Sequence, residues 1–120
     1  MIAGIGTDLV EIGRVEEMVH RGRHLSRIFT TTELACARDN AATLAGNFAV
    51  KEAVSKVFGT GFFGVEPYEI EVLRDTAGAP YVKLYGKAKQ VAEDKKICKI
   101  HVSITNTKDF AQAFAIGESV

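Results

Sequence analysis

The stretch AATLAGNFAVKEAVSKVFG, residues 41 to 59, decides the fold of this 120-residue chain. It contains no proline, it is apolar around most of a helical circumference, and it ends on Gly59, which suits the left-handed cap of a helix. We therefore predict one long helix over residues 41 to 58 that is packed on most of its sides. Three charged residues interrupt it and need an explanation: Lys51, Glu52 and Lys56.

The rest of the chain predicts short strands and helices on either side of this helix. The segments with a strand pattern are residues 2–12, 68–75, 80–86, 99–105 and 109–117, the last with a helix as its alternative. The segments with a helical pattern are residues 13–22, ended by Gly22, residues 26–40, with Thr31 or Thr32 as the N-cap, and residues 87–96. No linker or repeat divides the chain, so these elements predict a single α+β domain over residues 1–120, with a mostly antiparallel sheet packed against the long helix.

Composition limits the partners and the cellular location. Fifteen basic residues balance fifteen acidic ones, so the chain lacks the long-range field of a protein that binds nucleic acid or an anionic membrane. Cys36 and Cys98 have mostly apolar neighbours and no CxxC pair, and we expect both to be buried thiols in a reducing compartment. The sequence shows neither a signal-peptide pattern nor an apolar run of membrane-spanning length, so we expect a soluble cytoplasmic protein.

Glu52 and Lys56 lie one turn apart on the predicted helix, and alanine and phenylalanine side chains share their sector. The ordinary interpretation is a surface ion pair, which stabilises a helix by about 0.3–0.5 kcal/mol. Charged groups that enter the packed side of a helix cost on the order of several kcal/mol unless a partner compensates them. A metal ion or a bound phosphate is such a partner, because a carboxylate suits magnesium and a lysine offsets phosphoryl charge.

A magnesium site needs a second acid, and Asp8 in GIGTDLVE is the candidate. It lies between apolar residues, and the glycines before it permit close backbone approach. Its alternative is an ordinary helix-cap or turn residue. Near the other end of the chain, the strand pattern of KIHVSITN places His101, Ser103 and Thr105 on one polar face, where the alternative for His101 is a structural role.

Together these three segments resemble a known family. GIGTDLVEI, FAVKEAVSK and HVSIT occur in the order, and in a chain of the length, of the holo-acyl-carrier-protein synthases, the short class of 4′-phosphopantetheinyl transferases. The resemblance covers essentially the whole chain. It implies that the chain transfers the 4′-phosphopantetheine group of coenzyme A to a serine of apo acyl carrier protein, releases adenosine 3′,5′-bisphosphate and serves fatty acid biosynthesis.

The resemblance also implies roles for the matching residues. Asp8 and Glu52 would bind Mg²⁺ together with the coenzyme A pyrophosphate, and Lys56 would contact the transferred phosphoryl group. The base that takes the serine proton would be either Glu52 or a metal-bound water held by Asp8. His101 and Ser103, in the HVS segment, would lie by the coenzyme A groove. Members of the family are commonly homotrimers with the cofactor cleft between neighbouring subunits.

Two positions depart from the family pattern. Many relatives carry an arginine where this chain has Asn47, and a histidine where it has Asn106. Both positions lie toward the nucleotide end of the ligand in the family, so the resemblance does not carry contacts with the 3′-phosphate and adenine over to this chain.

Residues 13 to 29 hold four arginines and two histidines interleaved with apolar residues. Such a charge-rich segment is ordinarily a solvated face. Carrier proteins are strongly acidic, however, and in the family the first helix supplies the docking surface, beginning with an arginine that matches Arg14. We therefore expect Arg14, Met18 and Arg21 to bind the carrier protein, the arginines meeting carboxylates and Met18 meeting apolar side chains.

Two other functions are open at this point. A non-catalytic oligomeric module that binds a nucleotide or an acidic protein would use Glu52 and Lys56 as a structural ion pair. A magnesium phosphohydrolase would require more carboxylates than the two candidates, Asp8 and Glu52.

Overall fold

The computed structural model describes residues 1–59, 61–62 and 64–120. The strands are β1 (Ile2–Glu11), β2 (Ile70–Arg74), β3 (Pro80–Leu84), β4 (Ile97–Asn106) and β5 (Phe110–Ser119). The helices are α1 (Ile12–Arg21), α2 (Leu25–Ile28), α3 (Thr31–Ala37), α4 (Ala41–Phe58), α5 (Gly86–Asp94) and the short 3₁₀ helix η1 (Pro67–Glu69).

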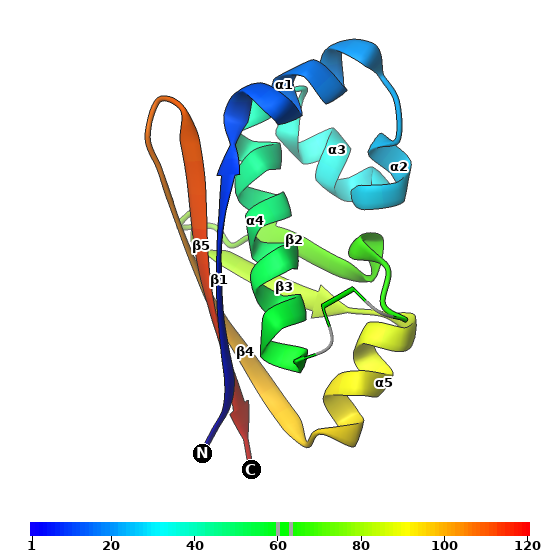
Figure 1. The fold of residues 1–120 in the computed structure, drawn as a ribbon, viewed down its shortest axis with the longest axis vertical. Coiled ribbons are helices and arrows are strands. Elements are labelled where there is room, and N and C mark those ends of the chain that lie inside the picture. The colour runs from blue at the N-terminus through cyan, green and yellow to red at the C-terminus, as the bar shows by residue number, and fades with distance from the viewer. Residues whose placement is uncertain (60, 63) are drawn as a thin grey trace.

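The long helix α4 runs through the middle of the molecule between two antiparallel sheets (Figure 1). The larger sheet has the strand order β1-β5-β4, and the smaller one is the β2-β3 hairpin. Helices α1, α2 and α3 gather around the N-terminal end of α4, and α5 lies toward its C-terminal end (Figure 1). The expected α+β fold with antiparallel strands packed on one long helix is therefore confirmed, with the strands divided between two sheets.

Glycines in β1 let this strand lie directly against α4. A Cβ added at Gly4 would lie 2.5 Å from the carbonyl oxygen of Val57, and one added at Gly6 would collide with the carbonyl of Ala53. No side chain therefore separates strand from helix at these points. The residues of β5 that face α4 are small as well: Ala111, Ala113, Ala115 and Gly117.

One charged residue of α4 lies inside the core. The Lys51 side chain is fully buried, and its Nζ donates to Glu33 Oε1 at 2.7 Å. The same ammonium donates to the carbonyl oxygens of Pro67 and Ile70 at 3.1 and 2.6 Å. The ion pair thus joins α4 to α3 and to the segment that enters β2. Lys51, and not Lys56 as the sequence suggested, occupies the packed side of the helix.

The sequence located the ends of the main helices correctly. The helix predicted over residues 41 to 58 occupies these residues, and Gly59 ends it with a φ of 77°. Gly22 ends α1 in the same left-handed conformation. The helix alternative for residues 109–117 is wrong, because this segment is strand β5 and every second residue packs toward α4.

The N-cap of α3 is Thr30, and the prediction of Thr31 or Thr32 is wrong. Thr30 Oγ1 accepts from the backbone N–H of Glu33, and the Glu33 carboxylate accepts from the backbone N–H of Thr30. This reciprocal capping box fixes the helix start one residue earlier than the run of threonines suggested.

The prediction that both cysteines are buried is also wrong. Cys36 and Cys98 are exposed free thiols. Cys98 stands on β4, where its Sγ donates to the carbonyl oxygen of Glu118 at 3.3 Å. Cys98 falls at the register shift between Ile97 and Lys99, so the apolar residues beside it in the sequence do not bury its thiol. The segment GTG at residues 59–61 has the composition of a helix cap followed by a turn, and Thr60 within it lies outside the described residues.

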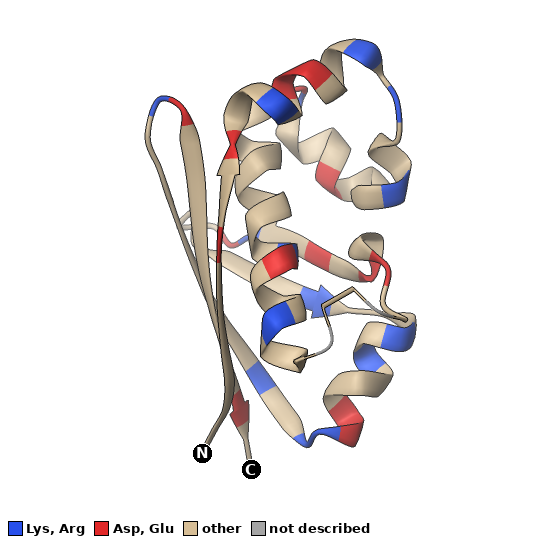
Figure 2. Ribbon diagram, in the orientation of Figure 1, with Lys and Arg blue, Asp and Glu red and all other residues tan. Residues whose placement is uncertain are grey.

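Charge is distributed unevenly over the helices. Figure 2 shows many charged residues on α1 and α5, whereas α4 carries charge only in its C-terminal half. Among the described residues, no helix combines the length and the hydropathy needed to cross a membrane.

The face of the larger sheet that points away from α4, here called the outer face, is rich in exposed apolar residues. They are Ile5, Leu9, Phe110, Phe114 and Ile116. Leu9 and Phe114 keep 58% and 57% of their surface exposed. Single exposed apolar residues are ordinary, but a group of them on one face marks an interaction surface.

Candidate active site

Strand β1 and helix α4 bring Asp8, Glu52 and Lys56 together. Gly6 meets the carbonyl of Ala53, and Asp8 follows two residues later on the same face of the strand. Two strand residues advance by about 6.6 Å, close to one helical turn. Because β1 advances toward the N-terminal end of α4, Asp8 lies beside the helical turn that precedes Ala53 and contains Glu52. The two carboxylates are therefore close enough to interact.

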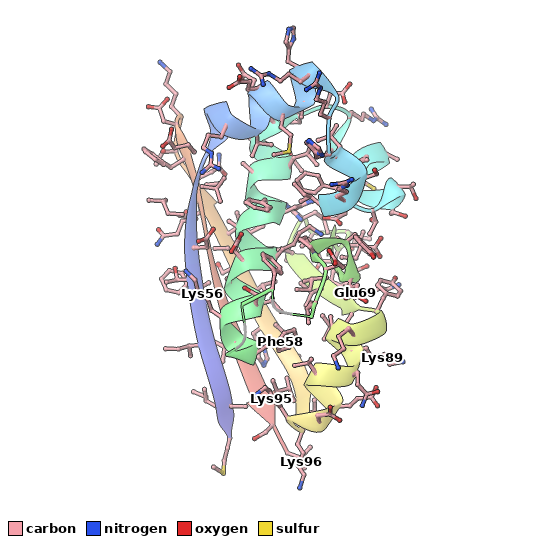
Figure 3. The ribbon with its side chains drawn as sticks, turned by 45° about the vertical axis from the view of Figure 1, so that its right-hand side comes forward. Lys56, Phe58, Glu69, Lys89, Lys95 and Lys96 are labelled. Atoms are coloured by element: carbon pink, nitrogen blue, oxygen red, sulfur yellow. The ribbon has the colours of Figure 1, made fainter. Side chains whose placement is uncertain are left out.

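Lys56 extends from α4 toward β1 (Figure 3). Its Nζ lies 3.5 Å from Asp8 Oδ1 and donates to the carbonyl oxygen of Thr7 at 2.8 Å. The Lys56 side chain remains 52% exposed, so the ammonium can still meet a ligand from solvent. The alternative of an ion pair between Glu52 and Lys56 is not supported, because Lys56 pairs with Asp8 and Thr7 of the strand instead.

The two carboxylates are held in conditions that disfavour their negative charge. Burial raises the pKa of Asp8, although the neighbouring Lys56 opposes this effect. Burial also raises the pKa of Glu52, and the negative charge of Asp8 raises it further. Among the described residues, no donor lies within hydrogen-bond distance of the Glu52 carboxylate. A bound cation would relieve this repulsion and supply the missing partner.

Two neighbouring carboxylates provide the hard oxygen ligands that Mg²⁺ prefers. The described part of the chain contains no cluster of three or more acidic, histidine or cysteine side chains that could enclose a metal. Mg²⁺ is commonly bound in this way, by one or two carboxylates together with water and substrate phosphates. Asp8 and Glu52 therefore fit a magnesium ion that is shared with a phosphorylated ligand. The alternative of Asp8 as a cap or turn residue is wrong, since it lies in the middle of β1.

His101 and Ser103 lie on the outer face of the sheet, away from Asp8 and Glu52. Their exposure alternates with the partly buried Val102, as the strand pattern predicted. His101 Nε2 lies 2.8 Å from Glu118 Oε1 on the neighbouring strand. Within one chain, the structure does not bring these two residues to the carboxylate pair.

A hollow of about 230 Å³ at the free edge of β1 connects the two faces of the sheet. Lys56 lines it from the α4 side, and Ile5 and Phe114 line it from the outer face. Whatever covers Phe114 on the outer face therefore lies next to Lys56.

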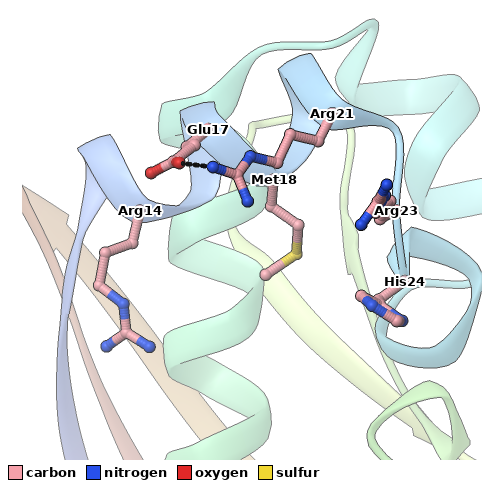
Figure 4. Close-up of a pocket in the computed structure, with 6 residues that line it drawn as sticks. All are labelled: Arg14, Glu17, Met18, Arg21, Arg23 and His24. Carbon is pink, nitrogen blue, oxygen red and sulfur yellow. Dashed lines mark ion pairs between the residues drawn. The ribbon is translucent and has the colours of Figure 1, made fainter.

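A second surface is the α1 patch, defined here as the residues around a depression of about 330 Å³ at the end of the molecule: Arg14, Glu17, Met18, Arg21, Arg23 and His24 (Figure 4). Glu17 and Arg21 form an exposed ion pair of 2.6 Å. Among the described residues, no carboxylate pairs with Arg14 or Arg23. Figure 4 shows the Met18 side chain between Arg14 and His24. The patch thus presents two uncompensated guanidinium groups around an apolar centre.

Sequence reasoning missed two features of the site. The carbonyl of Thr7 holds Lys56, and a backbone group leaves no signal in a side-chain pattern. Glu118, the partner of His101, could have been found, because the alternation of β5 places it on the outer face together with Ile116.

Comparison with known proteins gives one consistent result. Residues 4–115 match the model of the 4′-phosphopantetheinyl transferase superfamily. The chain is 51% identical over 120 residues to the holo-[acyl-carrier-protein] synthase of Lachnoclostridium phytofermentans, covering 100% of this chain and 98% of that relative.

Solved structures show the same fold. The holo-(acyl-carrier-protein) synthase of Bacillus anthracis in complex with CoA (3′,5′-ADP) matches with a TM-score of 0.83 and 34% identity, covering 100% of this chain and 99% of that one. The Helicobacter pylori holo-[acyl-carrier-protein] synthase in complex with coenzyme A matches with a TM-score of 0.85 and 29% identity, covering 95% of this chain and 99% of that one.

Proposed function

The chain belongs to the 4′-phosphopantetheinyl transferase superfamily and, within it, to the holo-[acyl-carrier-protein] synthases, and on that premise we propose the chemistry of its site. The enzyme moves the 4′-phosphopantetheine group of coenzyme A to a serine hydroxyl of an apo acyl carrier protein. The phosphoanhydride bond breaks, a serine phosphodiester forms, and adenosine 3′,5′-bisphosphate leaves. It does so in the cytoplasm, in fatty acid biosynthesis.

The observation that carries this proposal is the grouping of Asp8, Glu52 and Lys56 where β1 packs against α4. Asp8 and Glu52 would hold Mg²⁺, which when bound neutralises charge on the pyrophosphate of the donor. Lys56 donates to the phosphoryl group that is transferred, where negative charge accumulates in the transition state. Its tether to the Thr7 carbonyl limits the directions in which the ammonium can point.

The serine must lose a proton during the attack, and Glu52 is suited to accept it. In the absence of metal, burial and the charge of Asp8 raise the pKa of Glu52, which favours proton acceptance whenever this carboxylate is not bound to the cation. Asp8 is less available, because Lys56 already pairs with it.

The α1 patch is the proposed docking surface for the acidic carrier protein. Arg14 and Arg21 meet carboxylates of the carrier, and Met18 contacts apolar side chains between them. Helix α1 follows β1 directly in the chain. A carrier protein bound to the α1 patch would therefore lie near the end of the strand that holds Asp8.

We further propose that the enzyme is a homotrimer and that other copies of the chain cover the outer face. The exposed Leu9 and Phe114 are removed from water by this contact. The contact also explains the position of His101 and Ser103, which one copy presents at the edge of the Lys56 site of its neighbour. Phe114→Glu is expected to give monomers in light scattering and to reduce transfer, whereas Lys89→Glu on α5 leaves the trimer intact. A trimeric Phe114→Glu variant would contradict the proposed interface.

Mass spectrometry of an apo carrier protein tests the reaction itself. Incubation with this enzyme, coenzyme A and Mg²⁺ is expected to add one phosphopantetheine group, and a carrier with its serine replaced by alanine should gain nothing. Glu52→Gln should abolish the gain, and the matched surface variant Glu93→Gln on α5 should keep it. A folded enzyme that adds no mass to any apo carrier, yet is stabilised by a nucleotide, would indicate the non-catalytic module.

A further inference from the structure

Glu71 is a buried carboxylate that the proposed reaction does not use. It lies in β2, where the alternation of a strand would place it on the opposite face from Ile70 and Val72 and in contact with water. It is instead only 6% exposed. Among the residues that the structure describes, no basic group lies within 4 Å of its carboxylate. A buried carboxylate without a contacting cation requires other hydrogen-bond donors.

Two hydroxyl groups from distant parts of the chain supply these donors. Thr30 Oγ1 donates to Glu71 Oε2 at 2.6 Å, which is the length of a charge-assisted hydrogen bond. Tyr85, directly after β3, donates from its hydroxyl to Glu71 Oε1 at 2.9 Å. Thr30 Oγ1 also accepts from the backbone N–H of Glu33, which fixes the direction of its own bond to Glu71. Glu71 therefore ties the chain at Thr30 to the β2-β3 hairpin.

Thr30 ends a segment, residues 23–30, that is here called the α2 arm. The arm follows α1, turns through His24 with a φ of 63°, and contains the single-turn helix α2. So short a helix has no stability of its own, and no residue of α2 is fully buried. The position of the arm therefore depends largely on its C-terminal end, where Phe29 is 2% exposed and Thr30 is bonded to Glu71.

The N-terminal end of the α2 arm forms one wall of the α1 patch. Arg23 and His24 line the depression on the side opposite Arg14, with Met18 between the two sides (Figure 4). Helix α1 supplies the other wall. Arg23 has no carboxylate partner among the described residues, so the arm carries one of the two uncompensated guanidinium groups of the patch. Movement of the arm would therefore change the spacing of positive charge that an acidic partner meets.

On the basis of the proposed function, we propose that Glu71 is a positioning residue for docking of the carrier protein, because it fixes the α2 arm and so sets the spacing of Arg23 and Arg14. An arm that is already in place loses little conformational entropy when the carrier binds, whereas an untethered arm must be ordered at that moment. Loss of the tether should therefore weaken carrier binding and spare the chemical step. The tether does not require a negative charge, since a glutamine in place of Glu71 can accept from Thr30 and donate to Tyr85.

Calorimetry with an apo carrier protein whose serine is replaced by alanine measures docking without transfer. Glu71→Leu should raise the Kd for this carrier at least about fivefold, and Glu71→Gln should leave it within about twofold. Tyr85→Phe removes one of the two donors and should fall between them. The matched control is Ile97→Ala, which creates a buried cavity at the start of β4, far from the arm (Figure 1). It should lower the melting temperature without changing this Kd.

Two further measurements separate positioning from a general loss of stability. In Glu71→Leu the KM for the carrier should rise about as much as the Kd, while kcat and the KM for coenzyme A stay within about twofold of the wild type. Hydrogen exchange followed by mass spectrometry should show faster exchange of residues 23–29 in Glu71→Leu than in Glu71→Gln. Melting temperatures check that each variant is folded.

An unchanged carrier Kd in folded Glu71→Leu would overturn the proposal, and so would equal weakening in Glu71→Gln or in Ile97→Ala. Should Glu71→Leu fail to fold, Tyr85→Phe decides, and a wild-type Kd together with wild-type exchange of the arm would overturn the proposal. A wild type that binds no carrier and transfers nothing would reject the proposed function. Faster exchange of residues 23–29 in Glu71→Leu would in that case retain Glu71 as the residue that positions the arm.

Discussion

Lys51 and Glu52 are neighbours on α4, yet their surroundings differ completely. Lys51 is fully buried, and its ammonium has one carboxylate and two carbonyl partners. Glu52 is half-buried, has no partner for its carboxylate among the described residues, and lies near a second acid, Asp8. The first arrangement is complete without a ligand, whereas the second lacks a cation.

This difference teaches how one helix turn serves both folding and chemistry. A buried charge whose partners are all protein groups stabilises one arrangement of the chain, and removing a single partner is costly. A charge that the protein leaves uncompensated gains its partner only when a ligand binds. Substitutions at the two positions should therefore change different observables.

Glu52→Gln should show the largest effect, on activity alone. Loss of the base and of a metal ligand should reduce the transfer rate at least about 10³-fold. The melting temperature should stay the same or rise, because the repulsion between Glu52 and Asp8 disappears. Steady-state transfer and thermal unfolding measure the two quantities. A variant that loses stability instead would place Glu52 in the same class as Lys51.

Lys51→Met should show the opposite behaviour. It leaves Glu33 charged and buried without its partner, which should lower the free energy of unfolding by about 3–5 kcal/mol in urea titrations. The double variant Lys51→Met/Glu33→Leu should recover most of this loss, apart from about 1 kcal/mol for the capping box of α3. At temperatures where Lys51→Met is folded, its transfer rate should remain within a few-fold of the wild type. A large loss of rate in the folded variant would contradict the division between the two residues.

Lys56→Met should lie between these extremes. We expect the transfer rate to fall about 10²-fold, because a donor to the transferred phosphoryl group is lost. Stability should change by less than about 1 kcal/mol, since about half of the Lys56 side chain is exposed to solvent. Lys89→Met on α5 is the matched control. Unchanged transfer in Lys56→Met would remove Lys56 from the mechanism.

Ligand-induced stabilisation should be the smallest effect. With coenzyme A at ten times its Kd, binding adds about 1.4 kcal/mol to the free energy of unfolding, a shift of a few degrees. The shift should require Mg²⁺ in the wild type, and it should be small in Glu52→Gln with or without Mg²⁺. A full shift in the presence of a chelator would show that the carboxylates do not share a metal with the donor.

The fold was largely predictable because its signals are local. Gly22 and Gly59 end helices in the conformation that glycine favours, and the alternation in residues 99–105 needs no knowledge of the partner strand. Partners far apart in sequence were not predictable. Nothing in the neighbourhood of Lys51 indicates that Glu33 will lie beside it, so the sequence assigned the buried charge to the wrong lysine.

The candidate site was predictable only in part for the same reason. Asp8, Glu52 and Lys56 were singled out by residue type and by family resemblance, and β1 does pack against α4 where they lie. The sequence left open that His101 would lie on the other face of the sheet from Glu52.

The contact of Gly4 and Gly6 with α4 has a consequence for the tolerance of the enzyme to change. Side chains in a packed interior hop between rotamers and expand with temperature, but a main chain that touches another main chain has no such freedom. The spacing between Asp8 and Glu52 therefore depends on a contact between two main chains, and no side chain between β1 and α4 sets it at these points. Substitutions among the buried valines on the far side of α4 leave this main-chain contact in place.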